Sequence, residues 1–192
     1  QAYGFSKSDL EKMTSTRACV KCDLKGARLA GADLSGMDLR GVKLREAELK
    51  GANLMGANLD RADLRRANLE KSNLNGAKLR GAHLSGVDFE KASLRNADFS
   101  GADMRDADLE NARMGGAVLI GTDLRQADFK RSHLNGADLS GAALDGASME
   151  RARPRGAKLR KADLKEADME RADLTGADLG EADLRRVKMV RV

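Results

Sequence analysis

The chain has 192 residues, a formal net charge of +5 and only 3% aromatic residues, with no Trp and a single Pro. Leu, Ile, Val and Phe together make up about a fifth of the chain, which lies at the compositional border of disorder. This composition excludes a core of interleaved aromatic and β-branched side chains, and no apolar run approaches the length of a membrane span. The scarcity of proline and the balanced charges also exclude a Pro-rich or one-signed disordered linker.

Residues 1–21 carry no repeat and are predicted to form a helical cap and its junction. The segment 8–11 (SDLE) has the pattern of a capping box with Ser8 as the N-cap, so we expect a short helix over about 9–15. Its apolar residues would then cover the open end of the structure that follows, an interpretation that we prefer to a membrane helix or a partner-binding helix. These residues are Phe5, Leu10 and Met13.

The two cysteines, Cys19 and Cys22, form a single C-x-x-C at the end of this segment. We consider three interpretations: a structural disulfide, unpaired packing thiols, or a redox or metal site. The only histidines, His83 and His133, are 50 residues apart, so we predict no metal and no cofactor site. A disulfide implies an oxidising compartment. A first residue Gln1 in place of Met is typical of a mature exported chain, although a fragment boundary would look the same.

The dominant feature is a repeat of five residues. From 22 to 191 the sequence divides into 34 consecutive pentads without an insertion or deletion. The third position is Leu in 25 pentads, the first is Ala in 26, the second is Asp or Asn in 20, and the fifth is Gly in 17. We predict that 22–191 is a single domain.

A period of five is incompatible with an amphipathic helix, because a helix would rotate successive Leu residues by about 500° per pentad and leave no apolar stripe. In an extended segment the first and third positions share a face and point inward, and a turn at the fifth position starts the next side. Gly suits the positive φ of a type II turn, whereas residues such as Arg61 and Glu166 resist it. The pattern therefore predicts two turn populations in a solenoid of short strands.

Units such as Ala52-Asn53-Leu54-Met55-Gly56 follow the pattern A(D/N)LxG, which resembles the pentapeptide-repeat family. The resemblance implies an all-β solenoid, a right-handed quadrilateral parallel β-helix with four pentads per coil. On that basis we expect about 8.5 coils and a rod roughly 40 Å long. The helix followed by paired cysteines also looks like exported family members of the periplasm or thylakoid lumen, although a cytoplasmic location stays open.

The sequence offers no catalytic residues. Its carboxylates fall on the convex surface, where we expect them to bond backbone amides, and we find neither a phosphate-binding Gly loop nor a Ser-His-Asp set. One class within the family protects DNA gyrase by mimicking acidic duplex DNA. We number the four faces by the pentads that begin at 22, 27, 32 and 37. Their outward positions carry 0, 0, +2 and +1, and 1–21 adds +2, so DNA mimicry is only an alternative and we expect no nucleic-acid partner.

One cluster of cations departs from this balance. No acid interrupts the segment 151–161, and Pro154 occupies an inward Leu position in its middle, where it removes a backbone donor. The cluster indicates either an anion or acidic-partner site or an ordinary solvated face, since Lys158 falls between Asp138 and Asp178 in register. Together with the residues one and two coils earlier, the predicted patch consists of Arg113, His133, Arg151, Arg153, Arg155, Lys158, Arg160 and Lys161.

No capping segment follows the repeat in this sequence. We expect an exposed apolar end that can associate with a second copy of the chain, formed by Leu184, Val187, Met189, Val190 and Val192. The sequence thus predicts a non-catalytic rigid scaffold for an unidentified protein partner. The alternatives are a gyrase-protecting DNA mimic and a redox-linked lumenal or periplasmic protein that uses Cys19 and Cys22.

Overall fold

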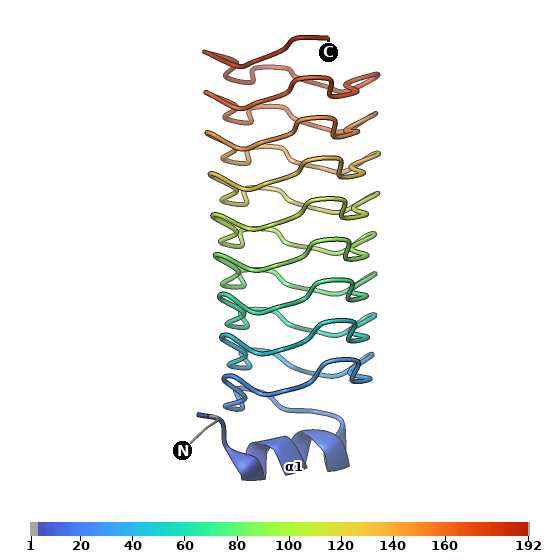
Figure 1. The fold of residues 1–192 in the computed structure, drawn as a ribbon, viewed down its shortest axis with the longest axis vertical. Helices are drawn as coiled ribbons and strands as arrows, with labels where there is room; N and C mark the ends of the chain where they lie inside the picture. The colour runs from blue at the N-terminus through green and yellow to red at the C-terminus, as the bar shows by residue number, and fades with distance from the viewer. Residues whose placement is uncertain (1–3, 192) are drawn as a thin grey trace.

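The computed structural model describes residues 4–191. It consists of one helix, α1 (Lys7–Thr16), followed by a stack of coils (Figure 1). Within the described residues no segment forms a strand, and each side of a coil, apart from the one with Asp173, contributes a single residue to isolated parallel β-bridges. The expected short strands are thus reduced to single bridges, because a five-residue side that includes a turn leaves only one residue to bridge.

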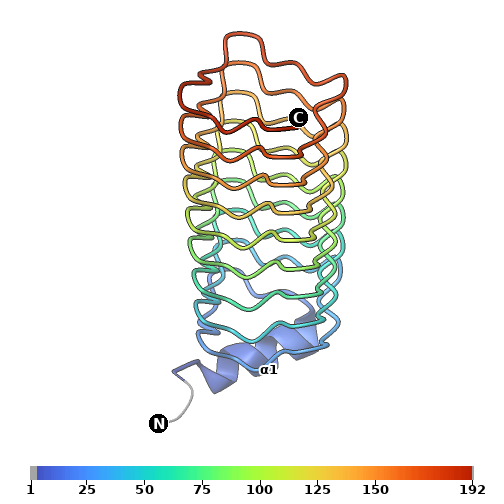
Figure 2. The same ribbon diagram turned by 45° about the horizontal axis from the view of Figure 1, so that its top comes forward.

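All bridges join residues 20 apart, so four pentads separate one coil from the next. Each side is held by three backbone hydrogen bonds: the amides of Leu24 and Gly26 donate to the carbonyls of Lys43 and Arg45 at 2.8 and 2.9 Å, and the amide of Lys43 donates to Cys22 at 2.8 Å. The tilted view in Figure 2 shows the coils lying directly above one another. This register satisfies the backbone without any wide sheet.

The core is a column inside the coils, as the pentad pattern predicted. First-position and third-position side chains are buried from Cys22 to Ala172, apart from the partly buried Ala32. Phe89 and Phe99 lie on facing sides of one coil and meet edge to face with ring centroids 6.0 Å apart. Each buried Leu contributes on the order of 2 kcal/mol, so regular stacking compensates for the poor composition.

The corners of the coil correct one prediction. The Gly corners have φ between 62° and 72°, and the 17 corners without Gly have φ between 57° and 61°, so there is one turn geometry and not two. At Arg61, for example, the amide donates to the carbonyl of Arg80 at 2.9 Å, and the turn closes with a 3.0 Å bond from Ala62 to Leu59. These bonds recur at every corner from Gly26 to Arg171 and offset the cost of about 1–2 kcal/mol for a left-handed non-Gly residue.

Helix α1 lies across the blue end of the stack in Figures 1 and 2. It is longer than predicted at both ends, and its N-cap is Ser6, not Ser8: the Ser6 hydroxyl accepts from the amide of Asp9 at 3.2 Å. Ser8 only contacts the Ser6 hydroxyl. Met13 is buried against the first coil, and Phe5 and Leu10 are partly buried there, as expected.

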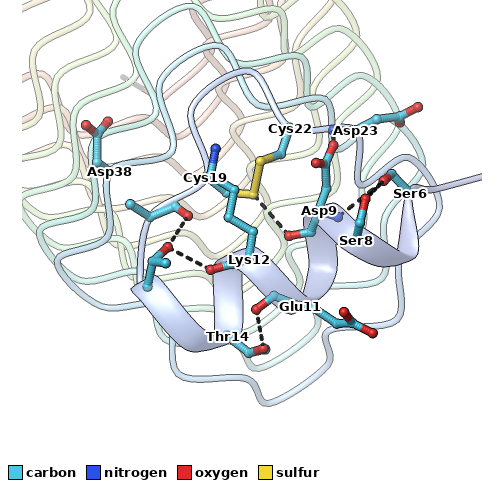
Figure 3. Close-up of a disulfide and its surroundings, with 12 residues drawn as sticks. Ser6, Ser8, Asp9, Glu11, Lys12, Thr14, Cys19, Cys22, Asp23 and Asp38 are labelled. Atoms are coloured by element: carbon cyan, nitrogen blue, oxygen red, sulfur yellow. Dashed lines mark hydrogen bonds between the residues drawn. A yellow bond between two sulfur atoms is a disulfide. The ribbon is translucent and has the colours of Figure 1, made fainter.

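Two contacts tie α1 to the first coil. The Asp9 carboxylate accepts from the amide of Asp23 at 2.8 Å, and the Ser6 amide donates to the Asp23 carbonyl at 2.9 Å (Figure 3). Cys19 and Cys22 form a disulfide, which selects the structural interpretation over unpaired thiols. Both cysteines are buried, and the sulfur of Cys19 lies 3.3 Å from the carbonyl of Asp9.

Pro154 interrupts the stack where the sequence indicated. Its column pairs in register up to His133 and Arg153, but no bridge forms between Arg153 and Asp173, because proline has no amide to donate to Asp173. The bond from Leu134 to the Arg153 carbonyl is 3.1 Å, against 2.7 or 2.8 Å at most equivalent sites. The bond from the amide of Asp173 to Ala152 survives at 2.9 Å, so the coils stay in register.

Candidate functional site

The second-position carboxylates and amides are occupied by the backbone. In all 20 pentads with Asp or Asn there, a side-chain oxygen accepts a hydrogen bond from the amide two residues later, as in Asn53 with Met55 at 3.0 Å. This is the Asx-turn geometry. The expectation that these groups bond amides is confirmed, and it leaves them poorly placed to act as acids or bases.

On the first face, Arg residues at the fourth position pair with these carboxylates. Arg105 and Arg125 each place a guanidinium nitrogen within 2.7 Å of Asp103 and Asp123, respectively. These bonds hold the pKa of both carboxyls below the usual range, and the pKa of Asp183 beside Arg185 falls to about 2. The exposed pairs therefore stay ionised over the physiological pH range.

The second face carries an acidic column that sequence inspection missed. Carboxylate oxygens of Asp88, Glu90 and Asp108, and of Asp108, Glu110 and Asp128, lie within 4.8 Å of one another. Oxygen clusters of this size suit hard cations such as Ca²⁺. Burial, the largest cause, and neighbouring carboxylates raise the pKa of Asp108 and of Glu90. Summing each face concealed this column, because cations at the fifth position cancel its charge.

The predicted basic patch divides into two parts. At its C-terminal side the cations are paired: Arg155 lies 3.3 Å from Asp173, and Arg160 and Lys161 lie 3.7 and 3.9 Å from Glu181. Lys158 is in register with Asp138 and Asp178. These residues correspond to the solvated-face interpretation.

The other part is concentrated on the third face. Arg113, His133 and Arg153 stack as consecutive bridged residues, and Arg151 lies beside them at the corner. Within residues 4–191, Arg113, Arg151 and Arg153 make no ion pair. Partial burial and the charges of Arg153, Arg113 and Arg95 lower the pKa of His133, as expected in a cationic environment.

Apolar side chains are exposed near the C-terminal end, between charged ones. Leu184, Met189 and Val190 are exposed, and Val187 is only partly buried against the core. Val192 lies outside the described residues. Within the described part of the chain, no helix is both long and apolar enough to span a bilayer.

The family model for pentapeptide repeats matches in eight copies over 22–61, 47–86, 72–111, 82–119, 112–151 and 155–189, omitting only the residues around Pro154 within the repeat region before 190. The chain belongs to the pentapeptide-repeat family. Membership and the solved relatives together imply a right-handed β-helix-type solenoid.

Three solved structures are similar to this pentapeptide-repeat protein. QnrB1, a plasmid-mediated fluoroquinolone resistance protein, superposes with a TM-score of 0.65 at 21% identity, over 90% of this chain and 88% of the other. A pentapeptide-repeat protein of the Arabidopsis thaliana thylakoid lumen is 33% identical over 52% of this chain and 70% of its own, with a TM-score of 0.51. HetL of the cyanobacterium Nostoc, involved in heterocyst differentiation regulation, is 33% identical over 85% and 79%, with a TM-score of 0.47. No curated protein sequence matches the chain.

Proposed function

We propose that this pentapeptide-repeat protein is a non-catalytic rigid scaffold whose outer faces bind a protein partner. The proposal includes a single domain, 22–191, a right-handed quadrilateral coil of about 8.5 turns, and a cap formed by 1–21. The observation that carries it is the unbroken 20-residue register, which holds outward side chains in fixed columns. Rigid columns of charge serve recognition, because little ordering entropy is lost on binding.

The chemistry of the faces supports the absence of catalysis. Second-position Asp and Asn oxygens accept from turn amides, and first-face carboxylates such as Asp103 and Asp123 are also paired with Arg. Catalytic acids and bases need pKa values tuned toward neutrality in a desolvated site. The pKa of Asp103 and of Asp123 is instead lowered by Arg pairing, away from that range.

An exported location is part of the proposal. The disulfide between Cys19 and Cys22 is typical of an oxidising compartment, and one of the two relatives that are 33% identical comes from the thylakoid lumen. The redox-linked alternative is less favoured, because both cysteines are buried and reactive cysteines are usually accessible. DNA mimicry is likewise less favoured, because the net charge is +5 and the acidic column covers only part of one face.

We also propose that two copies associate through the C-terminal end. The observation behind this proposal is the apolar surface there: Leu184, Met189 and Val190 are exposed, and Val187 is only partly buried. Light scattering of wild type and of Met189→Glu/Val190→Glu tests this: a concentration-dependent dimer lost in the variant is expected, and a wild-type monomer at all concentrations would contradict it.

The scaffold function is tested by site-specific photo-crosslinking in the native compartment. A photoreactive residue is placed at one fourth-position site per face, Ser85, Lys130, Asn135 and Ser140. A scaffold predicts one defined protein adduct from one face or from two neighbouring faces. Absence of adducts from all four faces would reject the proposal. It would also be rejected if the protein catalysed a reaction and substitution of an outward carboxylate abolished that activity.

A further inference from the structure

A basic hollow lies where the second and third faces meet. It has a volume of about 310 Å³ and is lined by Asn111, Arg131, His133, Arg151 and Arg153. Its lining comes from two columns, one of corner residues 111, 131 and 151 and one of second-position residues 133 and 153, and Arg113 continues the second column one coil earlier. We name these residues together the basic groove.

The cations of the groove are available for a partner. Arg113, Arg151 and Arg153 are exposed and make no ion pair within residues 4–191, whereas Arg131 lies 3.7 Å from Glu110. Such unpaired clustering is unfavourable in isolation, since like charges at short range repel. Partial burial, the largest cause, and the charges of the neighbouring Arg residues lower the pKa of His133.

The groove has a defined length. Along the second-position column it begins after Ser93 and ends before Asp173, so the basic run covers three coils. At about 4.8 Å per coil, the outermost cations of this column are roughly 10 Å apart along the rod. Asp173 closes the far end, and it is already paired with Arg155.

This spacing selects among acidic ligands. Acids on three successive turns of an α-helix, each about 5.4 Å apart, span about 11 Å, which matches the roughly 10 Å between the outermost cations to within about 1 Å. Acids on one face of an extended strand repeat at about 6.8 Å and run out of register by roughly 4 Å over the same distance. Arg guanidinium groups bind carboxylates in a bidentate manner and have enough reach to absorb the smaller mismatch.

Single-stranded nucleic acid fits the groove less well. Its binding proteins present exposed aromatic side chains on which bases stack. Within the described residues Phe89, Phe99 and Phe129 are fully buried and Phe5 is partly buried on the cap, so no such platform lies beside the groove.

We propose that the basic groove binds an acidic α-helix of a partner protein, lying along the rod with one carboxylate per turn against each coil. This inference rests on the proposed scaffold function and specifies its binding site. It would fail alone if the photo-crosslinking identified a partner on other faces while the groove bound no helix.

The probe is a synthetic helical peptide of about 16 residues with Glu at i, i+4 and i+7 on one face. A second peptide of the same composition with its Glu residues spread around the helix is the control. Binding is followed by NMR of the two histidines at about 50 mM salt, where surface charges are weakly screened. A carboxylate near His133 raises its pKa toward the usual value, and His83, on the first face, serves as an internal reference.

The expected result is a shift of His133 alone, with at least about tenfold tighter binding of the striped peptide. Arg113→Glu/Arg153→Glu should abolish binding. Lys43→Glu/Arg45→Glu changes the net charge equally on the first face and should leave affinity within about threefold. Arg113, Arg153 and Lys43 are exposed and Arg45 is partly exposed, and matching melting temperatures establish that the variants fold.

Three outcomes would overturn the inference. Equal affinity of the protein for both peptides would indicate attraction by overall charge and not recognition by the groove. Equal losses of affinity in the two double variants would lead to the same conclusion. Tighter binding of a DNA duplex or an oligothymidine than of the striped peptide would assign the groove to nucleic acid instead.

Discussion

At the scale of single residues, backbone conformation dominates over residue preference. Corners with and without Gly, such as Gly136 and Gln126, adopt the same positive φ, and up to Arg171 the same hydrogen bonds lie on either side of the corner. A residue with a side chain accepts the left-handed conformation at a cost, and Gly does not. The corners therefore differ in stability but not in shape.

We predict opposite effects for two glycines in neighbouring coils. Gly136→Ala places a methyl group on a corner with φ of 66° and should lower the free energy of unfolding by about 1 kcal/mol. No atom lies within 4 Å of the added carbon, so conformation alone causes the loss. Gly115→Ala is the control: this residue is not at a positive φ, and the change should be neutral or stabilising by up to about 1 kcal/mol. Chemical denaturation compares them, and equal effects would contradict the prediction.

Charge on the second face opposes the native state at neutral pH. Burial, the largest cause, and the carboxylates of Asp88, Asp128 and Glu110 raise the pKa of Asp108, so the folded chain binds the proton more tightly than the unfolded chain. Its ionisation thus destabilises the fold above the folded-state pKa. The penalty shrinks as pH falls below that pKa and is gone below the pKa of the unfolded chain. Lys130 and Arg131 contact Asp128 and Glu110 and relieve only part of the repulsion.

Asp108→Asn should therefore raise the melting temperature at pH 7, since Asn keeps the oxygen that accepts from the amide of Glu110. The gain should shrink as pH falls and wild-type Asp108 becomes protonated. Asp123→Asn is the matched control at the same pentad position: the pKa of Asp123 is lowered by Arg125, so its charge stabilises the fold above the usual pKa and the variant should melt earlier at pH 7. Thermal denaturation between pH 3 and 8 measures both, in the range where carboxyls titrate. A lower melting temperature for Asp108→Asn would disprove the repulsion.

At the scale of elements, α1 and the first coil form one unit joined by the disulfide and by Asp9. The short loop between Cys19 and Cys22 restricts the unfolded chain, and both sulfurs are buried. Cys19→Ala/Cys22→Ala should cost about 2 kcal/mol, a value from the loop-closure relation. Hydrogen exchange should localise the increased opening to residues 5–41, because repeats are coupled mainly to their neighbours. Uniformly increased exchange along the whole rod would contradict this.

The fold was predictable in the parts that repeat. The columns of Leu and Ala and the 20-residue register follow from a periodic apolar pattern and from the family resemblance. The corners were predicted wrongly, because residue preference was weighed without the bonds between coils that override it. The helix start was displaced by two residues, since both Ser6 and Ser8 precede acidic residues at capping distance. The acidic column was missed because charge was summed over faces and not by position.

At the scale of the whole molecule, the stack has one weakened contact between adjacent coils, at Pro154 and Asp173. Pro154 leaves the carbonyl of Asp173 without its usual donor, and the neighbouring bridge is absent. In a solenoid, opening spreads through contacts between adjacent coils, so a weakened contact separates the units on either side of it. The coils beyond residue 155 should open as a unit before those preceding it.

Pro154→Leu should strengthen this contact between the two coils. It restores the residue of the equivalent positions and a backbone bond to Asp173, with a gain of about 1 kcal/mol. Native-state hydrogen exchange should show slower exchange for residues 155–181 and little change in 42–121. Leu134→Met, one coil earlier in the same buried column, controls for general effects of core substitution and should not slow exchange in 155–181. Unchanged exchange in Pro154→Leu would show that the missing bond does not limit opening.

The 20-residue register also governs how such a chain can change in length. Duplication or loss of 20 residues changes the length of the rod by one coil, about 4.8 Å, and leaves every column of side chains on its own face. Duplication of a single pentad would instead rotate all later residues by a quarter turn. The acidic, basic and paired columns would then move to a neighbouring face in every coil that follows the duplication. The length of the rod can therefore change by whole coils of 20 residues without disturbing the surface pattern, whereas a change by fewer pentads would disrupt it.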